Sequence, residues 1–229
     1  MSSAVERRRE RWEPDARRRQ ILGCAVRLFG ERGYDDVSTA DIAGAAGVAR
    51  GLVNHYFGTK KDLYLEVVRL MVTLPDAAVA ASGEPDLAVR VDGAVTWFLD
   101  AVARHSQAWL AAIGAGGPGH TPDVAAVIAE GDEATIDVIL RLAGSPPDAP
   151  GGDEAATDLH RRAVLRAYVA FGRRGAVEWL VRGSLTREQT HVVLSRTLVT
   201  LLAETLPALA AMPPTRSGTG REVSPRPAP

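Results

Sequence analysis

Hydrophobic positions recur with helical spacing along most of the chain. In residues 16–32 they stand at i, i+1, i+4, i+7 and i+8, as Ile21, Leu22, Ala25, Leu28 and Phe29. This is the period of an amphipathic helix. The same period predicts helices over residues 61–74, 122–143, 154–182 and 186–206, and no stretch alternates as a strand does. The pattern therefore predicts an all-α fold.

The longest periodic run covers residues 86–113. Its apolar stripe, interrupted by one histidine, consists of Leu87, Val91, Ala94, Phe98, Val102, His105, Trp109 and Ile113. A stripe of this kind predicts one continuous helix of about seven turns with a single buried face. A glycine-rich loop is expected to follow at residues 114–121.

Residues 37–63 combine the signals of two short helices joined by a tight turn. Ser38 is a favoured N-cap before a helical run, and Gly47 allows the left-handed backbone that ends it. Val48 is expected to fill the gap between the helices. The second helix, residues 50–56, presents small or hydrogen-bonding side chains outward, as a recognition helix does in the major groove. The stretch predicts a helix-turn-helix.

The same stretch resembles the signature of the TetR family of bacterial transcriptional repressors. The resemblance rests on Ser38, Ile42, Ala43, Ala46, Gly47, Val48, Gly51, His55, Tyr56, Phe57, Lys60 and Leu63. It implies that DNA is bound by Ser38, Thr39, Arg50, Gly51, Asn54, His55, Tyr56 and Lys60. The chain departs from the family at Asn54, where a tyrosine is usual. An asparagine can pair bidentately with adenine, so base preference at this position is not carried over.

The pattern divides the chain into four parts. Residues 1–15 carry four closely spaced arginines without apolar periodicity, and they predict a flexible basic arm that is either a solvated tail or a contact to phosphates and the minor groove. Residues 16–62 form the predicted DNA-binding domain, and residues 63–211 a C-terminal domain for ligand binding and dimerisation. Residues 212–229, with five prolines, predict a disordered tail.

Composition supports a cytoplasmic protein without catalytic or metal chemistry. Of 229 residues, 46% are hydrophobic and 24% charged, and no export leader or membrane-spanning run is expected. The single cysteine, Cys24, excludes an intrachain disulfide. The five histidines lack metal-ligand spacing, and no catalytic motif is present. We therefore expect no metal, no cofactor and no enzyme. Residues 1–63 carry 12 Lys and Arg against 9 Asp and Glu, which agrees with DNA binding only together with the motif.

Aromatic residues outside the helix-turn-helix gather on two predicted helices. They are Trp97, Phe98 and Trp109 on the first, and Tyr168, Phe171 and Trp179 on the second. Core packing explains such residues as well as a ligand cavity does. TetR-like proteins place the inducer site among these helices, so the resemblance favours a pocket. His105, the polar member of its stripe, is the candidate polar ligand contact.

The last predicted helix, residues 186–206, is apolar on more than one side. A helix with one buried face does not need this breadth, so a second side is expected to face another subunit. Val192, Leu198 and Leu202 are the predicted dimer contacts.

Three functions remain open at this point. The first is a homodimeric repressor that binds a palindromic operator and is released by a small, largely apolar ligand. The second is an activator or a DNA-binding protein that responds to no ligand, and the third is a helical enzyme or carrier. The helix-turn-helix favours the first two. A large apolar cavity, together with ligand-dependent release from DNA, distinguishes the first from the second.

Overall fold

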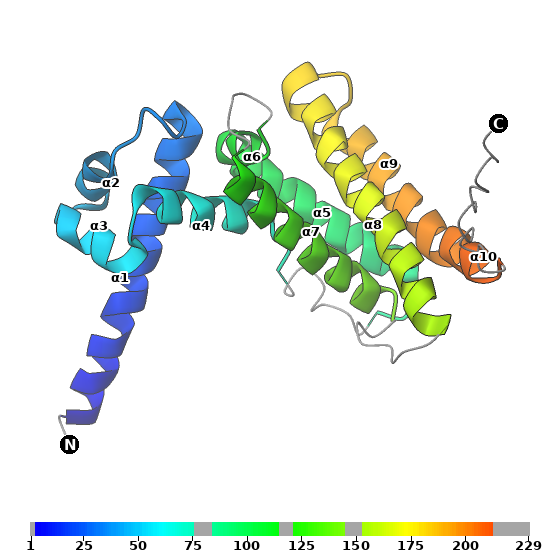
Figure 1. The fold of residues 1–229 in the computed structure, drawn as a ribbon, viewed down its shortest axis with the longest axis horizontal. Helices are drawn as coiled ribbons and strands as arrows, with labels where there is room; N and C mark the ends of the chain where they lie inside the picture. The colour runs from blue at the N-terminus through cyan, green and yellow to red at the C-terminus, as the bar shows by residue number, and fades with distance from the viewer. Residues whose placement is uncertain (1–2, 76–83, 115–120, 145–152, 213–229) are drawn as a thin grey trace, which may run out of the picture.

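The fold consists of helices throughout the part of the chain that the structure describes. The computed structural model describes residues 3–75, 84–114, 121–144 and 153–212 (Figure 1). The elements are α1 (Ser3–Arg32), α2 (Thr39–Ala46), α3 (Arg50–Phe57), α4 (Lys60–Val72), α5 (Leu87–Arg104), α6 (Ser106–Ala112), α7 (Pro122–Leu142), α8 (Asp153–Val177), η2 (Glu178–Arg182), α9 (Arg187–Thr200), η3 (Leu201–Thr205) and α10 (Leu206–Ala210). The predicted all-α class, with an N-terminal helix-turn-helix and a larger helical domain, is confirmed.

Helix α1 begins earlier than the apolar pattern predicted. Residues 1–15 were expected to form a flexible basic arm, but in the structure α1 starts at Ser3 and its first turns extend past α3 (Figure 1). Arginine, glutamate and alanine are good helix formers, so a helix can form where the sequence shows no apolar periodicity. The helix ends at Gly33, whose φ of 77° lies in the left-handed region.

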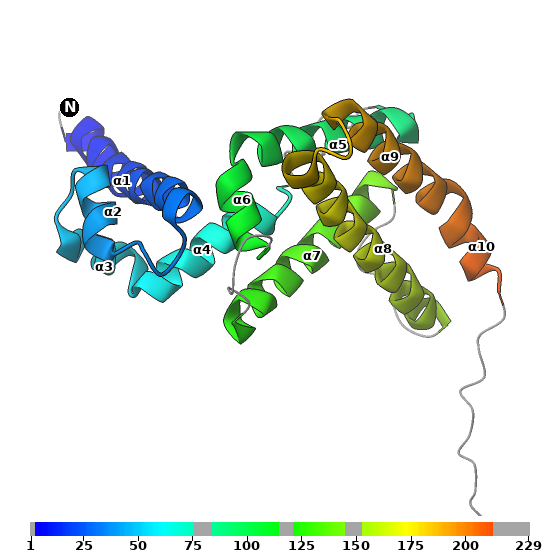
Figure 2. The ribbon, with the colours of Figure 1, turned by 90° about the horizontal axis from the view of Figure 1, so that it is seen from above.

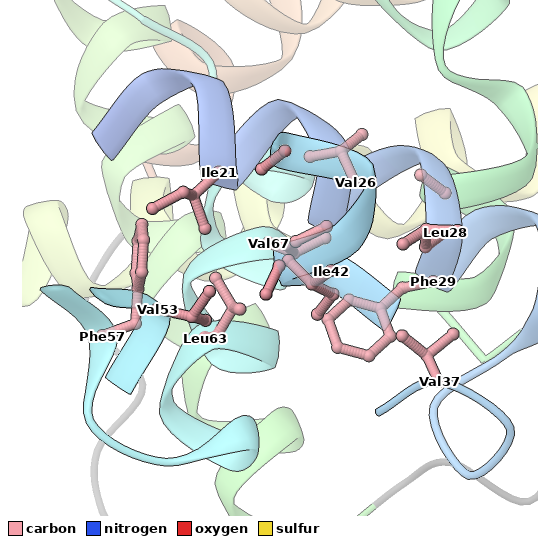
Figure 3. Close-up of a cluster of buried hydrophobic side chains, with 14 residues drawn as sticks. Ile21, Val26, Leu28, Phe29, Val37, Ile42, Val53, Phe57, Leu63 and Val67 are labelled. Atoms are coloured by element: carbon pink, nitrogen blue, oxygen red, sulfur yellow. The ribbon is translucent and has the colours of Figure 1, made fainter. Parts of the chain in front are cut away.

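The N-terminal core joins α1, α2, α3 and the first half of α4. Its buried side chains include Ile21, Phe29, Ile42, Val53, Leu63 and Val67 (Figure 3). Tyr34 packs against this core and stacks on Phe29 with ring centroids 6.0 Å apart. The boundary expected between residues 62 and 63 lies inside α4, because Leu63 and Val67 complete this core.

The predicted continuous helix over residues 86–113 is wrong. The chain breaks at His105, which ends α5 and precedes α6 with φ −125° and ψ 32°. Beyond the break, Ala108 joins the N-terminal core, and Trp109 packs with Val102 and with Val177 of α8. The apolar residues after His105 are therefore buried by elements distant in sequence, which a periodicity within one helix does not show.

Two glycines let the helices of the two domains approach closely. A Cβ on Gly30 of α1 would lie 2.7 Å from the backbone nitrogen of Ala108 in α6. A Cβ on Gly131 of α7 would lie 2.6 Å from a methyl carbon of Val72, at the end of α4. Helix α7 runs through Gly131 without a break. These contacts join the DNA-binding module to the C-terminal domain at two separate places.

The C-terminal domain has its own core between α5, α7, α8 and α9. Leu99, Ile136, Leu140, Leu165 and Leu194 are almost completely buried in it. Both views place α8 and α9 at the end of the molecule opposite α2 and α3 (Figures 1 and 2). The loop expected at residues 114–121 and the tail expected at residues 212–229 lie mostly outside the described residues.

Candidate DNA-binding face and ligand cavity

Helix α3 has one buried face and one exposed face. Val53 is 1% exposed and Phe57 is 5% exposed, and both pack into the N-terminal core. The residues that lie on the exposed face are Arg50, Gly51, Asn54 and His55. Tyr56 is half-buried against the same core, beside the ring of His55. The buried side chains thus fix the orientation in which α3 presents its polar residues to solvent.

Thr39 holds Arg50 in place. The Arg50 Nε donates a hydrogen bond of 3.1 Å to the Thr39 hydroxyl oxygen, and Thr39 itself is buried. Thr39 was predicted to contact DNA. In the structure its hydroxyl orients the arginine at the start of α3, across the turn of the helix-turn-helix.

The N-termini of α2 and α4 open on one hollow of about 480 Å³ beside α3. The predicted DNA-binding residues that line it are Ser38, Thr39, Arg50, Asn54 and Lys60. Helix N-termini carry a partial positive charge and free backbone N–H groups, which favour phosphate. Asp35 and Asp36 also line the hollow, so its charge is mixed.

Each of these N-termini is closed by a capping box. The Ser38 hydroxyl accepts from the Asp41 backbone N–H at 3.1 Å, and the Asp41 carboxylate accepts from the Ser38 backbone N–H at 2.8 Å. Thr59 and Asp62 repeat the arrangement at α4. Hydrogen bonds from Ser38 and from Thr59 lower the pKa of Asp41 and of Asp62, respectively, so both carboxylates stay ionised at neutral pH.

Lys60 lies at the edge of the same hollow. Its ammonium stands 4.3 Å from the centre of the Tyr34 ring and donates to the backbone carbonyl of Asp35 at 3.4 Å. A cation over an aromatic face is held by the ring quadrupole. These contacts hold the Lys60 ammonium near the start of α4.

A cavity of about 830 Å³ lies between the two domains. Residues of α1, α4, α5, α6, α7, α8 and α9 line it. The structure brings five of the predicted pocket residues together around it: Trp97, Phe98, His105, Trp109 and Tyr168. Phe171 and Trp179 are not among its lining residues, and Phe171 is 42% exposed. A volume of this size lies within the usual range of small-molecule sites.

Most of the polar groups facing the cavity already have partners. The Tyr168 hydroxyl donates to the Leu194 carbonyl at 3.0 Å, and burial raises the pKa of this hydroxyl, which stays protonated. Arg173 pairs with Asp132, a buried carboxylate on α7. Such a pair, once buried, is costly to break because either partner alone would be an uncompensated charge.

Arg18 connects the cavity to the recognition helix. Its guanidinium lines the cavity, donates to Glu66 of α4 at 2.6 Å, and lies 4.7 Å from the centre of the Phe57 ring at the end of α3. The same side chain thus contacts the cavity, α4 and α3.

Comparison with known proteins finds relatives of the N-terminal part of the chain. Residues 21–67 match the family model of bacterial regulatory proteins, tetR family. The HTH-type transcriptional regulator BetI of Brucella anthropi is 47% identical over 53 residues, which are 23% of this chain and 27% of that protein. Over these residues the chain is similar to TetR-family regulators. It aligns with less than a third of the length of this curated relative.

Solved TetR-family structures extend the likeness to the whole fold. A TetR-family regulator from Streptomyces coelicolor aligns with a TM-score of 0.60 at 23% identity, over 86% of this chain and 87% of its own. The multidrug binding protein EbrR complexed with imidazole aligns with a TM-score of 0.52 at 23% identity, over 79% and 93%. At this identity the likeness shows the fold of a TetR-family protein.

The predicted dimer residues fall in different surroundings in the structure. Val192 is 51% exposed. Leu198 is only 3% exposed and packs in the C-terminal core, so its prediction as a subunit contact is wrong. Leu202 is partly buried against the same core. Periodicity assigned Leu198 to a second apolar side, whereas α5 and α8 cover that side within one chain.

The C-terminal helix nevertheless leaves an apolar surface exposed. The helical segment Arg187–Ala210 is long enough and apolar enough to cross a membrane, by length and composition only. Only 17% of its most apolar stretch is buried. Val192 and Val193 are exposed on this helix, and Phe171 and Val181 are exposed on α8 and η2. Apolar patches on soluble proteins usually mark an interaction site.

The sequence reasoning missed three residues of these sites. Thr59 and Asp62 follow the same T-x-x-D spacing as the capping box at Ser38, which was a detectable signal. Arg18 gave no such signal, because its partners Phe57 and Glu66 are 39 and 48 residues away along the chain. Within the described ranges, no three His, Cys, Asp or Glu side chains are placed to hold a metal ion.

Proposed function

We propose that the protein is a homodimeric, ligand-responsive transcriptional repressor that binds a palindromic operator. The observation that supports this most directly is α3, whose buried Val53 and Phe57 leave Arg50, Asn54 and His55 exposed beside two capped helix N-termini. In this proposal the exposed residues contact base edges, and the N-termini and Lys60 contact phosphates. The proposed location is the cytoplasm.

The dimer would place two copies of α3 on successive major grooves, about 34–36 Å apart. The exposed apolar surface of α8 and α9 is the proposed contact between subunits. Helices α8 and α9 lie at the end of the molecule opposite α2 and α3 in both views (Figures 1 and 2). A twofold arrangement through this surface would leave both recognition helices free to face DNA.

The cavity is the proposed effector site. A ligand there would contact the end of α4, because Met71, Val72 and Thr73 line the cavity. Helix α4 follows α3 after two residues, so its displacement would change the separation of the two recognition helices. The effector binds more tightly to the arrangement of the dimer that does not fit DNA. The equilibrium between the two arrangements then shifts by the difference in its affinity for them. An activator that uses the same contacts is the alternative proposal.

The test separates base contacts from phosphate contacts. A half-site is first selected from random DNA, and binding is then measured for Asn54→Ala and Lys60→Ala. We expect Asn54→Ala to change the preferred base at one position at a cost of about 1–3 kcal/mol. Lys60→Ala is expected to weaken all sequences alike and to reduce the salt slope by about one unit.

Two results would contradict the proposal. One is that the full chain selects no sequence from random DNA. The other is that Asn54→Ala and Lys60→Ala have the same effect on every half-site, which would mean that α3 contributes charge without base specificity. Arg27→Gln on the exposed face of α1 is the matched control, because it removes one charge outside the hollow and outside α3.

A further inference from the structure

The arginines that line the cavity differ in whether a carboxylate pairs with them. Four arginines contribute to its wall, and three of them are paired with carboxylates. The pairs are Arg18 with Glu66 at 2.6 Å, Arg69 with Glu130 at 3.1 Å, and Arg173 with Asp132 at 3.0 Å. These three cations are neutralised before any ligand enters.

Arg104 is the exception. Its Nε donates to the backbone carbonyl of Asp100 at 3.3 Å, and among the described residues no carboxylate pairs with it. The carboxylate of Asp100, four residues earlier on α5, is engaged by Arg187 of α9. Arg104 and the adjacent His105 are both exposed and both line the cavity. They place an uncompensated positive charge and an imidazole at its mouth.

The interior of the cavity offers little to a polar ligand. Its walls include the buried side chains of Val95, Leu142 and Leu198. The hydroxyls of Thr135 and Tyr168 already donate to backbone carbonyls. A ligand hydroxyl placed there without a partner would lose its hydrogen bonds to water. The interior therefore favours a hydrocarbon chain or ring system.

We infer that the effector is an amphipathic monoanion, with an apolar body in the cavity and a carboxylate at Arg104. The inference rests on the proposed function, because it takes the cavity to be the effector site. A guanidinium binds a carboxylate with two parallel hydrogen bonds, which fixes the orientation of the ligand. The break between α5 and α6 at His105 brings this anchor to the edge of an otherwise apolar space.

The probes are straight-chain carboxylates of eight, ten and twelve carbons, with the 1-alkanols and alkylammonium ions of the same lengths. Binding to the full chain is measured by calorimetry, at concentrations below micelle formation. Each added methylene is expected to tighten binding about fourfold until the cavity is full. At equal length, the carboxylate is expected to bind roughly tenfold more tightly than the alkanol.

The variants assign the preference to one side chain. Arg104→Gln is expected to remove the advantage of the carboxylate over the alkanol and to keep the dependence on chain length. Arg104→Lys retains the charge and is expected to keep part of the advantage. Arg19→Gln is the matched control, because Arg19 is also exposed but does not line the cavity. It should bind every probe as the unmodified protein does.

The outcomes separate the ligand class from the proposed function. Equal binding of acids and alkanols, or preference for the alkylammonium ions, would overturn the anionic class while leaving the cavity as an effector site. A carboxylate preference that persists in Arg104→Gln would overturn the assignment to this arginine. If no probe of any charge binds, the effector site itself is wrong, whereas DNA selection by the same protein would still support the DNA-binding function.

Discussion

A methyl group added at Gly131 is expected to separate α4 from α7. The new Cβ would lie 2.6 Å from a methyl carbon of Val72 and 3.2 Å from the Val72 carbonyl oxygen. The valine has a stiff χ1 and the oxygen belongs to the backbone, so neither can move aside without moving α4. Gly131→Ala therefore tests whether the two helices depend on this close approach.

The expected change in the free energy of unfolding follows from two opposing effects. Replacing a helical glycine by alanine favours the helix by about 1 kcal/mol. Overpacking a close contact costs about 1–3 kcal/mol. The free energy of unfolding is therefore expected to fall by about 0–2 kcal/mol in Gly131→Ala, as the difference between these two terms. Without the close contact, the substitution would stabilise the protein.

Gly93→Ala is the matched control. Gly93 also lies inside a helix, α5, and a Cβ there would meet no atom within 4 Å. This variant is expected to gain about 0.5–1 kcal/mol. Urea denaturation of both variants, at one fixed protein concentration, gives the comparison because dimerisation would couple stability to concentration.

A second substitution at Val72 tests whether this residue causes the loss of stability in Gly131→Ala. Val72→Ala removes the methyl group nearest the new Cβ, so the double variant Val72→Ala/Gly131→Ala is expected to be more stable than the sum of the single changes by about 1 kcal/mol. Equal stabilisation by Gly131→Ala and Gly93→Ala would refute the reasoning, as would single-variant effects that simply add.

Two further changes test the subunit contact and the helix cap. Val192→Glu is expected to convert the dimer to a monomer, as measured by light scattering. Val89→Glu, at an equally exposed site on α5, is the control and should leave the dimer intact. If the unmodified protein is a monomer, the proposal of two half-sites is wrong. The hydrogen bonds from Thr59 lower the pKa of Asp62 below its ordinary 3.8, so its contribution to stability is present above that pH and is lost as the pH falls through the folded-state value. Asp62→Asn should therefore reduce the loss in the free energy of unfolding as the pH is lowered. If this loss is unchanged in the variant, the cap at Asp62 is not its cause.

Local signals were sufficient to predict the DNA-binding module. Ser38 caps α2 as predicted, and Gly47 adopts a φ of 63°. Val48 packs against the N-terminal core between the two helices. Each of these depends on residues within about ten positions, where side-chain chemistry determines the backbone directly.

Contacts between distant segments could not be predicted in the same way. The stripe from Leu87 to Ile113 is compatible with one long helix, but α6 turns at His105 because Ala108 and Trp109 pack on α1 and α8. Leu198 shows the converse error. An apolar residue on a second helix face can be covered by the same chain or by another, and periodicity carries no information on which of the two occurs.

The two glycine contacts give the proposed effector response a mechanical basis. Val72, which packs on Gly131, also lines the cavity, and so do Arg18 and Glu66 where α1 meets α4. Close packing leaves little space for gradual deformation, so a ligand that spreads α4 from α7 must move α4 as a body. Gly30 and Ala108 hold α1 to α6 at the other contact. We therefore expect α4 to turn about the α1–α6 contact, carrying α3 with it, when the effector binds.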